Sequence, residues 1–175
     1  MTPRLIQELV EGRLDTAIVA LPVSEPSLTE VALFEEKFLL VRPGADEGTP
    51  VPSREMMREM RLLLLEEGHC FRDQALSFCN MQSAPPREML DANSLSTLVQ
   101  MVSAGIGVTL IPEMAVTVET RSASVSLARF NDPQPARTIG MVWRKTSPLA
   151  RQLLQISEVI CLSADALRER HPPEA

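Results

Sequence analysis

Several features common in membrane, secreted and nucleic-acid-binding proteins are absent from this sequence. No apolar run approaches the roughly 20 residues that are needed to cross a bilayer. The opening residues, MTPRLIQELVEGRLD, lack the basic flank and the apolar block of a signal peptide. We therefore expect a cytoplasmic protein that has no membrane partner.

Basic residues are also scarce. The chain has 17 lysines and arginines and 23 acidic residues, which gives a net charge of −6. No cluster of lysine and arginine stands out along the chain. A domain that grips nucleic acid normally presents a basic face, since neutralised phosphates supply most of the affinity. This segment, taken alone, is therefore not expected to bind DNA.

The chain has three cysteines and two histidines, too few for a disulfide scaffold of this length. A reducing compartment keeps such cysteines as thiols. A disulfide between two of them would therefore act as a redox signal and not as a structural crosslink. A zinc site needs four ligands. His69, Cys70 and Cys79 offer three at an unusual spacing, and His171 lies in the tail. We expect no metal and no other cofactor.

What remains is the composition of a globular protein, with 45% hydrophobic and 23% charged residues. The apolar periodicity alternates between that of helices and that of strands, which predicts an α/β fold. Continuous apolar runs suggest strands buried on both faces, as in a parallel sheet covered by helices. Gly12 is expected to end the first helix, and Gly105 and Gly107 to follow a later one. The predicted helices span residues 3–12, 53–60, 71–81, 94–104 and 148–170. The predicted strands span residues 15–21, 29–34, 37–41, 61–65, 108–111, 125–130 and 138–143.

The most informative stretch is LEEGHCFRDQALSFCNM, residues 65–81. Cys70 lies at or near the start of a predicted helix. Unpaired backbone N–H groups there, the cation of Arg72 and a protonated His69 would each lower the pKa of the Cys70 thiol. The thiolate is the species that attacks a peroxide oxygen, so this is where a sensor thiol would lie.

Cys70 and Cys79 are nine residues apart. On one continuous helix they would be about 13 Å apart along the axis and would face opposite sides. A disulfide needs Cα atoms about 4.4–6.8 Å apart, so the two thiols can bond only if the helix unwinds or folds back. The spacing is equally compatible with two small buried residues, which is what most unpaired cysteines are. Cys161, on a helix with Leu153 and Ile160, is expected only to pack.

A second stretch, NSLSTLVQMVSAGIGVTLIPEMAV, covers residues 93–116. Ser94 is a good N-cap for a helix that leads into a buried strand. The N-terminus of this helix, with Ser94, Ser96 and Thr97, could hold a small polar or anionic ligand. The alternative is that these hydroxyls only cap the helix.

The pattern SL-x-TL-x-x-MV-x-AG-x-G-x-TLIP resembles the effector-binding region of LysR-type transcriptional regulators. The run LEEGHCFRDQALSFC resembles the redox segment of the branch of this family that senses hydrogen peroxide, and PARTIGMVWRKTSPL, residues 135–149, is similar to a segment of the same branch. EGRLDTAIVAL and EVALFEEKFLL match in kind and order, so the resemblance covers nearly the whole chain.

The resemblance implies an α/β regulatory domain of two Rossmann-like subdomains, of the periplasmic-binding-protein-like type. Subdomain I would comprise residues 1–33 and 139–170, and subdomain II residues 34–138 with the redox segment at 68–81. The crossovers would lie near residues 33–37 and 137–140, and residues 171–175 would be a frayed tail. We expect subdomain I to be incomplete, without its first strand–helix–strand, and the winged helix-turn-helix and linker helix of the family to lie outside this sequence.

The resemblance also implies roles for individual residues. Cys70 would be the peroxidatic cysteine and Cys79 the resolving one. His69 and Arg72 would flank the Cys70 thiol, Arg137 would reach it from a crossover, and Thr2 would help to hold the peroxide.

The implied partners are hydrogen peroxide, a thiol reductant that resets the disulfide, and further copies of the chain. These copies would form a dimer of regulatory domains, and a tetramer in the full-length parent, which would contact DNA only through its N-terminal domain. We do not expect an enzyme. Two other functions stay open at this point: a thiol peroxidase that turns over, and a small-molecule effector-binding domain whose cysteines are incidental.

Overall fold

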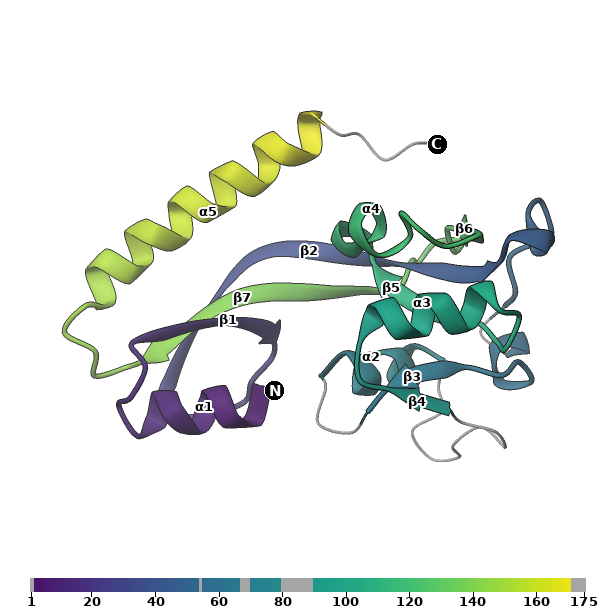
Figure 1. Cartoon of the computed structure of the whole chain (residues 1–175). Helices are drawn as coiled ribbons and strands as arrows, with labels where there is room; N and C mark the ends of the chain where they lie inside the picture. Colours follow the sequence, from purple (N-terminus) through teal and green to yellow (C-terminus); the bar gives the residue numbers. More distant parts are fainter. Residues whose placement is uncertain (1, 54, 67–69, 80–89, 171–175) are drawn as a thin grey trace. The chain divides into compact units, whose positions relative to one another are not determined.

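The computed structural model describes residues 2–53, 55–66, 70–79 and 90–170. The chain divides into two compact units, one formed by Met1–Glu35 and Arg137–Ala175 and the other by Glu36–Ala136. Both units contain strands and helices (Figure 1). The α/β class that the sequence predicts is confirmed.

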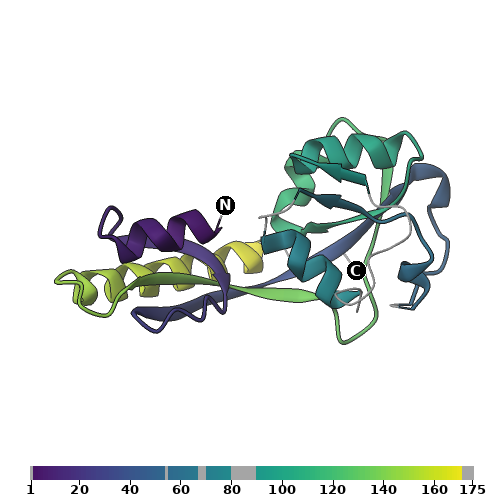
Figure 2. The ribbon, with the colours of Figure 1, turned by 90° about the horizontal axis from the view of Figure 1, so that it is seen from below.

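The first unit contains α1 (Thr2–Val10), β1 (Thr16–Leu21), the start of β2 (Leu28–Pro43), β7 (Ala136–Arg144) and α5 (Ala150–Arg170). β1 pairs antiparallel with β7, and β7 lies next to β2 in the sheet. The two helices lie on opposite sides of these strands (Figures 1 and 2). α1 ends because Gly12 adopts a left-handed φ of 78°, as the sequence predicts. The helix packs Leu9 into a small core.

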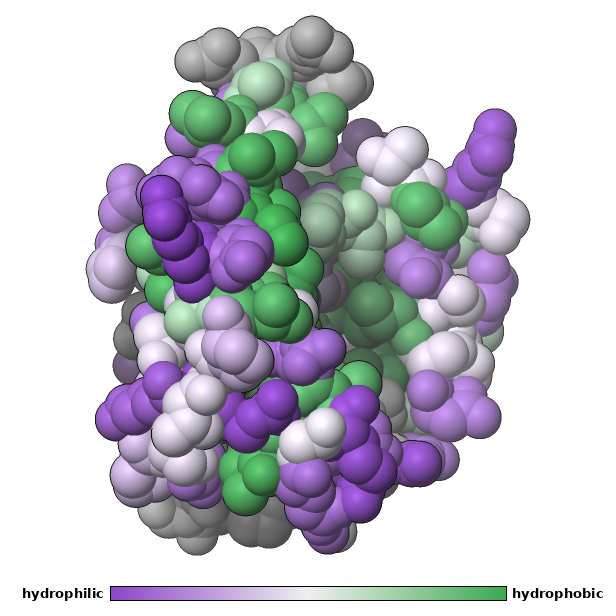
Figure 3. All heavy atoms as spheres, turned by 90° about the vertical axis from the view of Figure 1, so that its left-hand side faces the viewer, coloured by the Kyte–Doolittle hydropathy of each residue, from purple (hydrophilic) through white to green (hydrophobic). Residues whose placement is uncertain are grey.

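α5 buries one stripe of side chains against the strands, including Leu153 and Ser157. The Cys161 thiol donates to the Leu33 carbonyl oxygen at 3.3 Å, so this cysteine packs against β2. Hydrophobic side chains also line the solvent side of this helix (Figure 3). The exposed large apolar residues of α5 are Leu154, Ile156, Val159, Leu162 and Leu167.

The second unit is built around the C-terminal half of β2, which pairs antiparallel with β5 (Thr109–Pro112) on one side and β6 (Val125–Ala128) on the other. β3 (Leu63–Leu65) pairs in parallel with β4 (Leu90–Ala92). An isolated parallel bridge pairs Leu62, just before β3, with Val108, just before β5. The shorter elements of this unit are η1 (Gly44–Asp46), η2 (Met56–Arg58), η3 (Glu113–Ala115) and α4 (Val116–Glu119).

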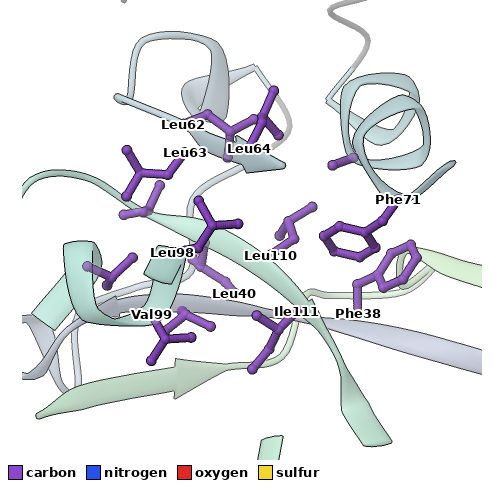
Figure 4. Close-up of a cluster of buried hydrophobic side chains, with 14 of the residues drawn as sticks. Phe38, Leu40, Leu62, Leu63, Leu64, Phe71, Leu98, Val99, Leu110 and Ile111 are labelled. Atoms are coloured by element: carbon purple, nitrogen blue, oxygen red, sulfur yellow. The ribbon is translucent and has the colours of Figure 1, made fainter. Parts of the chain in front are cut away.

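Two helices, α2 (Cys70–Phe78) and α3 (Leu95–Ser103), pack their apolar faces on these strands. Their side chains pack against those of β2, β3 and β5 in one continuous core (Figure 4). The residues of this core that are labelled in Figure 4 are Phe38, Leu40, Leu62, Leu63, Leu64, Phe71, Leu98, Val99, Leu110 and Ile111.

The structure corrects several local predictions. Residues 29–34 and 37–41 belong to one strand, β2, because Glu35 and Glu36 continue it; Glu36 is only 4% exposed. Where the structure describes residues 53–60, at 53 and 55–60, it shows the 3₁₀ turn η2 and no α-helix. β4 and α4 have no counterpart among the predicted elements.

The parallel arrangement inferred for the buried strands is wrong for the main pairings. β1–β7, β2–β5 and β2–β6 are antiparallel, and β3–β4 is parallel. The run TAIVAL of β1 is not buried throughout, since Ile18 is 54% exposed while Val19 and Ala20 are buried. A short apolar run does not reveal how many of its faces are covered, because that depends on what packs against it.

Candidate redox segment

α2 opens at Cys70 and presents a buried face to the core of the second unit. Phe71, Ala75 and Cys79 follow one another at intervals of four residues, and all three are buried. The rings of Phe71 and Phe38 meet edge to face with centroids 5.1 Å apart (Figure 4). A nine-residue helix is marginal by itself in water, so this packing supplies most of its stability.

Arg72 fastens the first turn of α2 to the strands beneath it. Its Nη1 donates to the Leu65 carbonyl oxygen at 2.8 Å and to Asp91 Oδ1 at 2.6 Å. The Arg72 side chain is 8% exposed and that of Asp91 is 39% exposed. The sequence predicts Arg72 beside the Cys70 thiol. In the structure its guanidinium bridges the end of β3 and β4, a contact that the sequence does not reveal.

Several contacts hold the C-terminal end of α2. The Cys79 N–H donates to the Ala75 carbonyl oxygen at 3.1 Å, so helical hydrogen bonding continues through Cys79. The Cys79 side chain is fully buried in the core. Phe78 meets Phe130 edge to face at 4.9 Å, and Arg58 Nε donates to the Cys79 carbonyl oxygen at 3.3 Å.

The two cysteines are therefore placed at opposite ends of a continuous helix. Nine residues at the helical rise separate their Cα atoms by about 13 Å, roughly twice the span that a disulfide allows. The Cys70 side chain lies outside what the structure describes, as does His69. α2 must lose its helical hydrogen bonds at one end before a sulfur of Cys79 can reach Cys70.

A cavity of about 220 Å³ lies beside the last turn of α2. Phe78 and Phe130 form part of its wall. It is further lined by Val51, Pro52, Ser53, Asn131, Asp132 and Pro133. Phe78 therefore borders free space on one side and the Phe130 ring on another.

The hydroxyls at the N-terminus of α3 are engaged within the protein. Ser94 Oγ accepts from the Thr97 N–H at 3.2 Å and lies 2.9 Å from the Thr97 hydroxyl. The Ser96 hydroxyl donates to a Glu119 carboxylate oxygen. This arrangement is that of a capped helix, and the nearby carboxylate would repel an anion. It supports the capping alternative for these residues over a ligand site.

The other predicted site residues lie in the first unit. Thr2 opens α1 and Arg137 lies near the start of β7, and both are half-buried. Cys70 belongs to the second unit, so the predicted proximity of these residues to its thiol stays a prediction. Among the residues that the structure describes, no three histidine, cysteine or acidic side chains are grouped as metal ligands. Within the same residues no helix is long and apolar enough to span a membrane.

Comparison with known proteins identifies the family. The model of the LysR substrate binding domain matches residues 1–160. The chain belongs to the LysR substrate-binding domain family. The resemblance that the sequence motifs predict is thereby confirmed, together with the α/β fold of these domains.

Within the LysR family, this domain is similar to proteins that are named for hydrogen peroxide. It is 43% identical over 166 residues to a probable hydrogen peroxide-inducible genes activator of Streptomyces viridosporus, covering 91% of this chain and 52% of that protein. It is 40% identical over 163 residues to the DNA-binding transcriptional dual regulator OxyR of Escherichia coli, covering 91% and 53%. The chain spans about half the length of these curated relatives.

Solved structures of OxyR share the fold. A hydrogen-peroxide-bound cysteine mutant of OxyR from Corynebacterium glutamicum superimposes with a TM-score of 0.84 at 31% identity, covering 94% of this chain and 53% of that one. The reduced OxyR regulatory domain from Pseudomonas aeruginosa gives a TM-score of 0.78 at 32% identity, covering 93% and 78%. These relatives are transcription regulators, as the sequence predicts.

Proposed function

We propose that this chain is the redox-sensing regulatory domain of a LysR-type transcription regulator, and that hydrogen peroxide converts Cys70 and Cys79 into a disulfide. The observation that carries the proposal is the position of these cysteines at opposite ends of α2, one in its first turn and one buried in the core. The similarity to regulators named for hydrogen peroxide supports the choice of oxidant.

The chemistry takes place in two steps. The Cys70 thiolate attacks one oxygen of hydrogen peroxide, which gives a sulfenic acid on Cys70 and releases hydroxide. The Cys79 sulfur then attacks the sulfenic sulfur, so that the disulfide forms and water leaves. A thiol reductant returns both cysteines to thiols and is itself oxidised. The roles of His69, Arg72, Arg137 and Thr2 around the thiolate are part of this proposal.

The output is a change of shape. A Cys70–Cys79 disulfide is incompatible with an intact α2, so its formation unwinds at least one end of the helix and removes either Phe71 or Phe78 and Cys79 from the contacts that they now make. We propose that this remodelling alters contacts between copies of the chain, as a dimer of regulatory domains within a tetramer, and so repositions DNA-binding domains carried elsewhere in the parent protein. In this proposal the domain works in the cytoplasm and is not an enzyme, because one oxidation yields one signal.

Mass spectrometry after peroxide treatment, alkylation and digestion tests the proposal. The wild-type chain is compared with Cys70→Ser, Cys79→Ser and, as the matched control, Cys161→Ser. We expect a Cys70–Cys79 disulfide at low peroxide in the wild type and in the control, a sulfenic acid on Cys70 in Cys79→Ser, and no oxidation in Cys70→Ser. Three alkylated thiols after peroxide would refute the proposal and favour a small-molecule effector-binding domain. Sustained consumption of peroxide with a thiol reductant would favour a peroxidase.

A further inference from the structure

The contact between Arg58 and the Cys79 carbonyl joins the redox segment to a part of the chain 21 residues upstream. The last carbonyls of an α-helix have no partner within the helix, and a cation near them is favourable because of the helix dipole. Arg58 Nε donates to one of these carbonyls at 3.3 Å. The guanidinium therefore caps the end of α2 from outside the helix.

The turn that carries Arg58 is itself fixed to the core. η2 places Met57 in the same buried cluster that receives Cys79, and Met57 is fully buried. The Met57 N–H donates to the Ser53 carbonyl oxygen at 3.0 Å, and the Arg58 N–H donates to that of Glu55 at 3.1 Å. Arg58 is thus presented to α2 by an anchored turn, although its own side chain reaches solvent.

The contact is lost in any route to the disulfide that moves the Cys79 end of α2. Closing a Cα separation of about 13 Å to the 4.4–6.8 Å of a disulfide moves the backbone of Cys70 or Cys79 by roughly 7 Å. A hydrogen bond at 3.3 Å breaks when its partner moves by even a fraction of that distance. Arg58 therefore stabilises the reduced, helical state and contributes nothing to a state in which Cys79 has moved.

We propose that Arg58 is a positioning residue that restrains the C-terminal end of α2 and so sets the rate at which Cys79 reaches oxidised Cys70. The inference rests on the proposed function and deepens it. Arg58 binds a backbone carbonyl and not the reacting atoms, so it acts on the second step, in which the disulfide forms and water leaves. The first step, oxidation of the Cys70 thiolate by peroxide, should not depend on it.

The test is a pair of rate measurements on the reduced chain and its variants. Arg58→Met removes the charge and the donor while keeping an apolar stem, and Arg58→Lys restores the charge without the planar donor. Arg121→Met is the matched control, because Arg121 is an exposed arginine of the same unit. Rapid quenching after peroxide separates sulfenic acid on Cys70 from the disulfide. Oxidised glutathione serves as a second oxidant that forms the disulfide by exchange.

We expect the disulfide to form about two- to fivefold faster in Arg58→Met with either oxidant. This ratio corresponds to the free energy that a favourable charge contributes at a helix C-terminus. Sulfenic acid should form at the wild-type rate, Arg58→Lys should recover part of the restraint, and Arg121→Met should behave as wild type. If Arg58 only stabilised the fold, Arg58→Met would lower the stability of the protein to urea. It would not change the rate of disulfide formation relative to the rate of sulfenic acid formation.

The outcomes separate this inference from the proposed function. If peroxide leaves the thiols unreacted but glutathione forms the disulfide faster in Arg58→Met, the proposed function fails and the restraint stands. If peroxide forms the disulfide at one rate in both proteins, the proposed function stands and the restraint is refuted. No disulfide with either oxidant would overturn both.

Discussion

The ion pair between Arg72 and Asp91 allows a quantitative test of how α2 is fastened to the strands. Arg72 Nη1 lies 2.6 Å from Asp91 Oδ1, with the arginine side chain 8% exposed and the aspartate side chain 39% exposed. Exposed pairs contribute about 0.2–1 kcal/mol, whereas breaking a buried pair costs about 3–5 kcal/mol. The half-exposed aspartate places this pair between these limits, so we expect a coupling energy of about 1–2 kcal/mol.

A double-mutant cycle with Arg72→Met and Asp91→Asn measures this coupling. The four proteins are unfolded in urea under reducing conditions and followed by far-UV circular dichroism, with equal m-values as the condition for comparing them. The coupling should persist at high salt, because the arginine is shielded from solvent. A coupling below about 0.5 kcal/mol would refute the reasoning, since the pair would then behave like a solvated surface contact.

Three further predictions concern positions outside α2. In Gly107→Ala, the added Cβ would lie 2.4 Å from the Arg61 carbonyl oxygen, so the bridge between Leu62 and Val108 should be strained and urea stability should fall by roughly 1–3 kcal/mol; an unchanged midpoint would contradict the close approach. Ser94→Ala should cost about 1 kcal/mol by removing the cap of α3, and Ser96→Ala clearly less, in the same assay. The hydroxyl and N–H of Ser27 donate to Glu25 and lower the pKa of its carboxyl, so this carboxylate favours the folded state above its unfolded pKa and the contribution is lost as pH falls through the lowered value. An NMR titration should show a higher Glu25 pKa in Ser27→Ala, and equal values would contradict the hydrogen bonds.

Much of the fold could be predicted because local rules and tertiary packing agree there. Ser94 caps α3, which begins at Leu95, and Gly12 takes the left-handed conformation just beyond α1. In each case a single residue type with a specific backbone preference marks the boundary.

The remainder depends on partners that a sequence pattern does not specify. The three residues of β4 carry no periodicity, and they form a strand because β3 lies beside them. Glu36 looks like a break between two strands, yet it continues β2 in a buried position. Arg58 and Asp91 secure α2 from 12 or more residues away in the chain, and only a folded structure brings them to it.

The proposed switch requires α2 to open, and its exposed face offers a way to change the opening equilibrium without touching the core. Ser77 is exposed on α2, on the side away from Phe71 and Cys79. In a helix interior glycine is about 1 kcal/mol less favourable than alanine, which is an upper bound for Ser77 in the last turn of α2. Ser77→Gly should therefore raise, and Ser77→Ala lower, the fraction of molecules in which α2 is unwound, with up to about a fivefold ratio between the two variants.

The alkylation rate of Cys79 in the reduced protein reports this fraction, because a fully buried thiol reacts only after the helix opens. Cys161, on α5 in the other unit, serves as the internal reference and should react at one rate in all three proteins. The rate of disulfide formation should follow the same order as the alkylation rate. Equal Cys79 alkylation in the glycine and alanine variants would mean that Cys79 becomes exposed without unwinding of α2 at Ser77. Unwinding at this end of α2 could then no longer account for the disulfide.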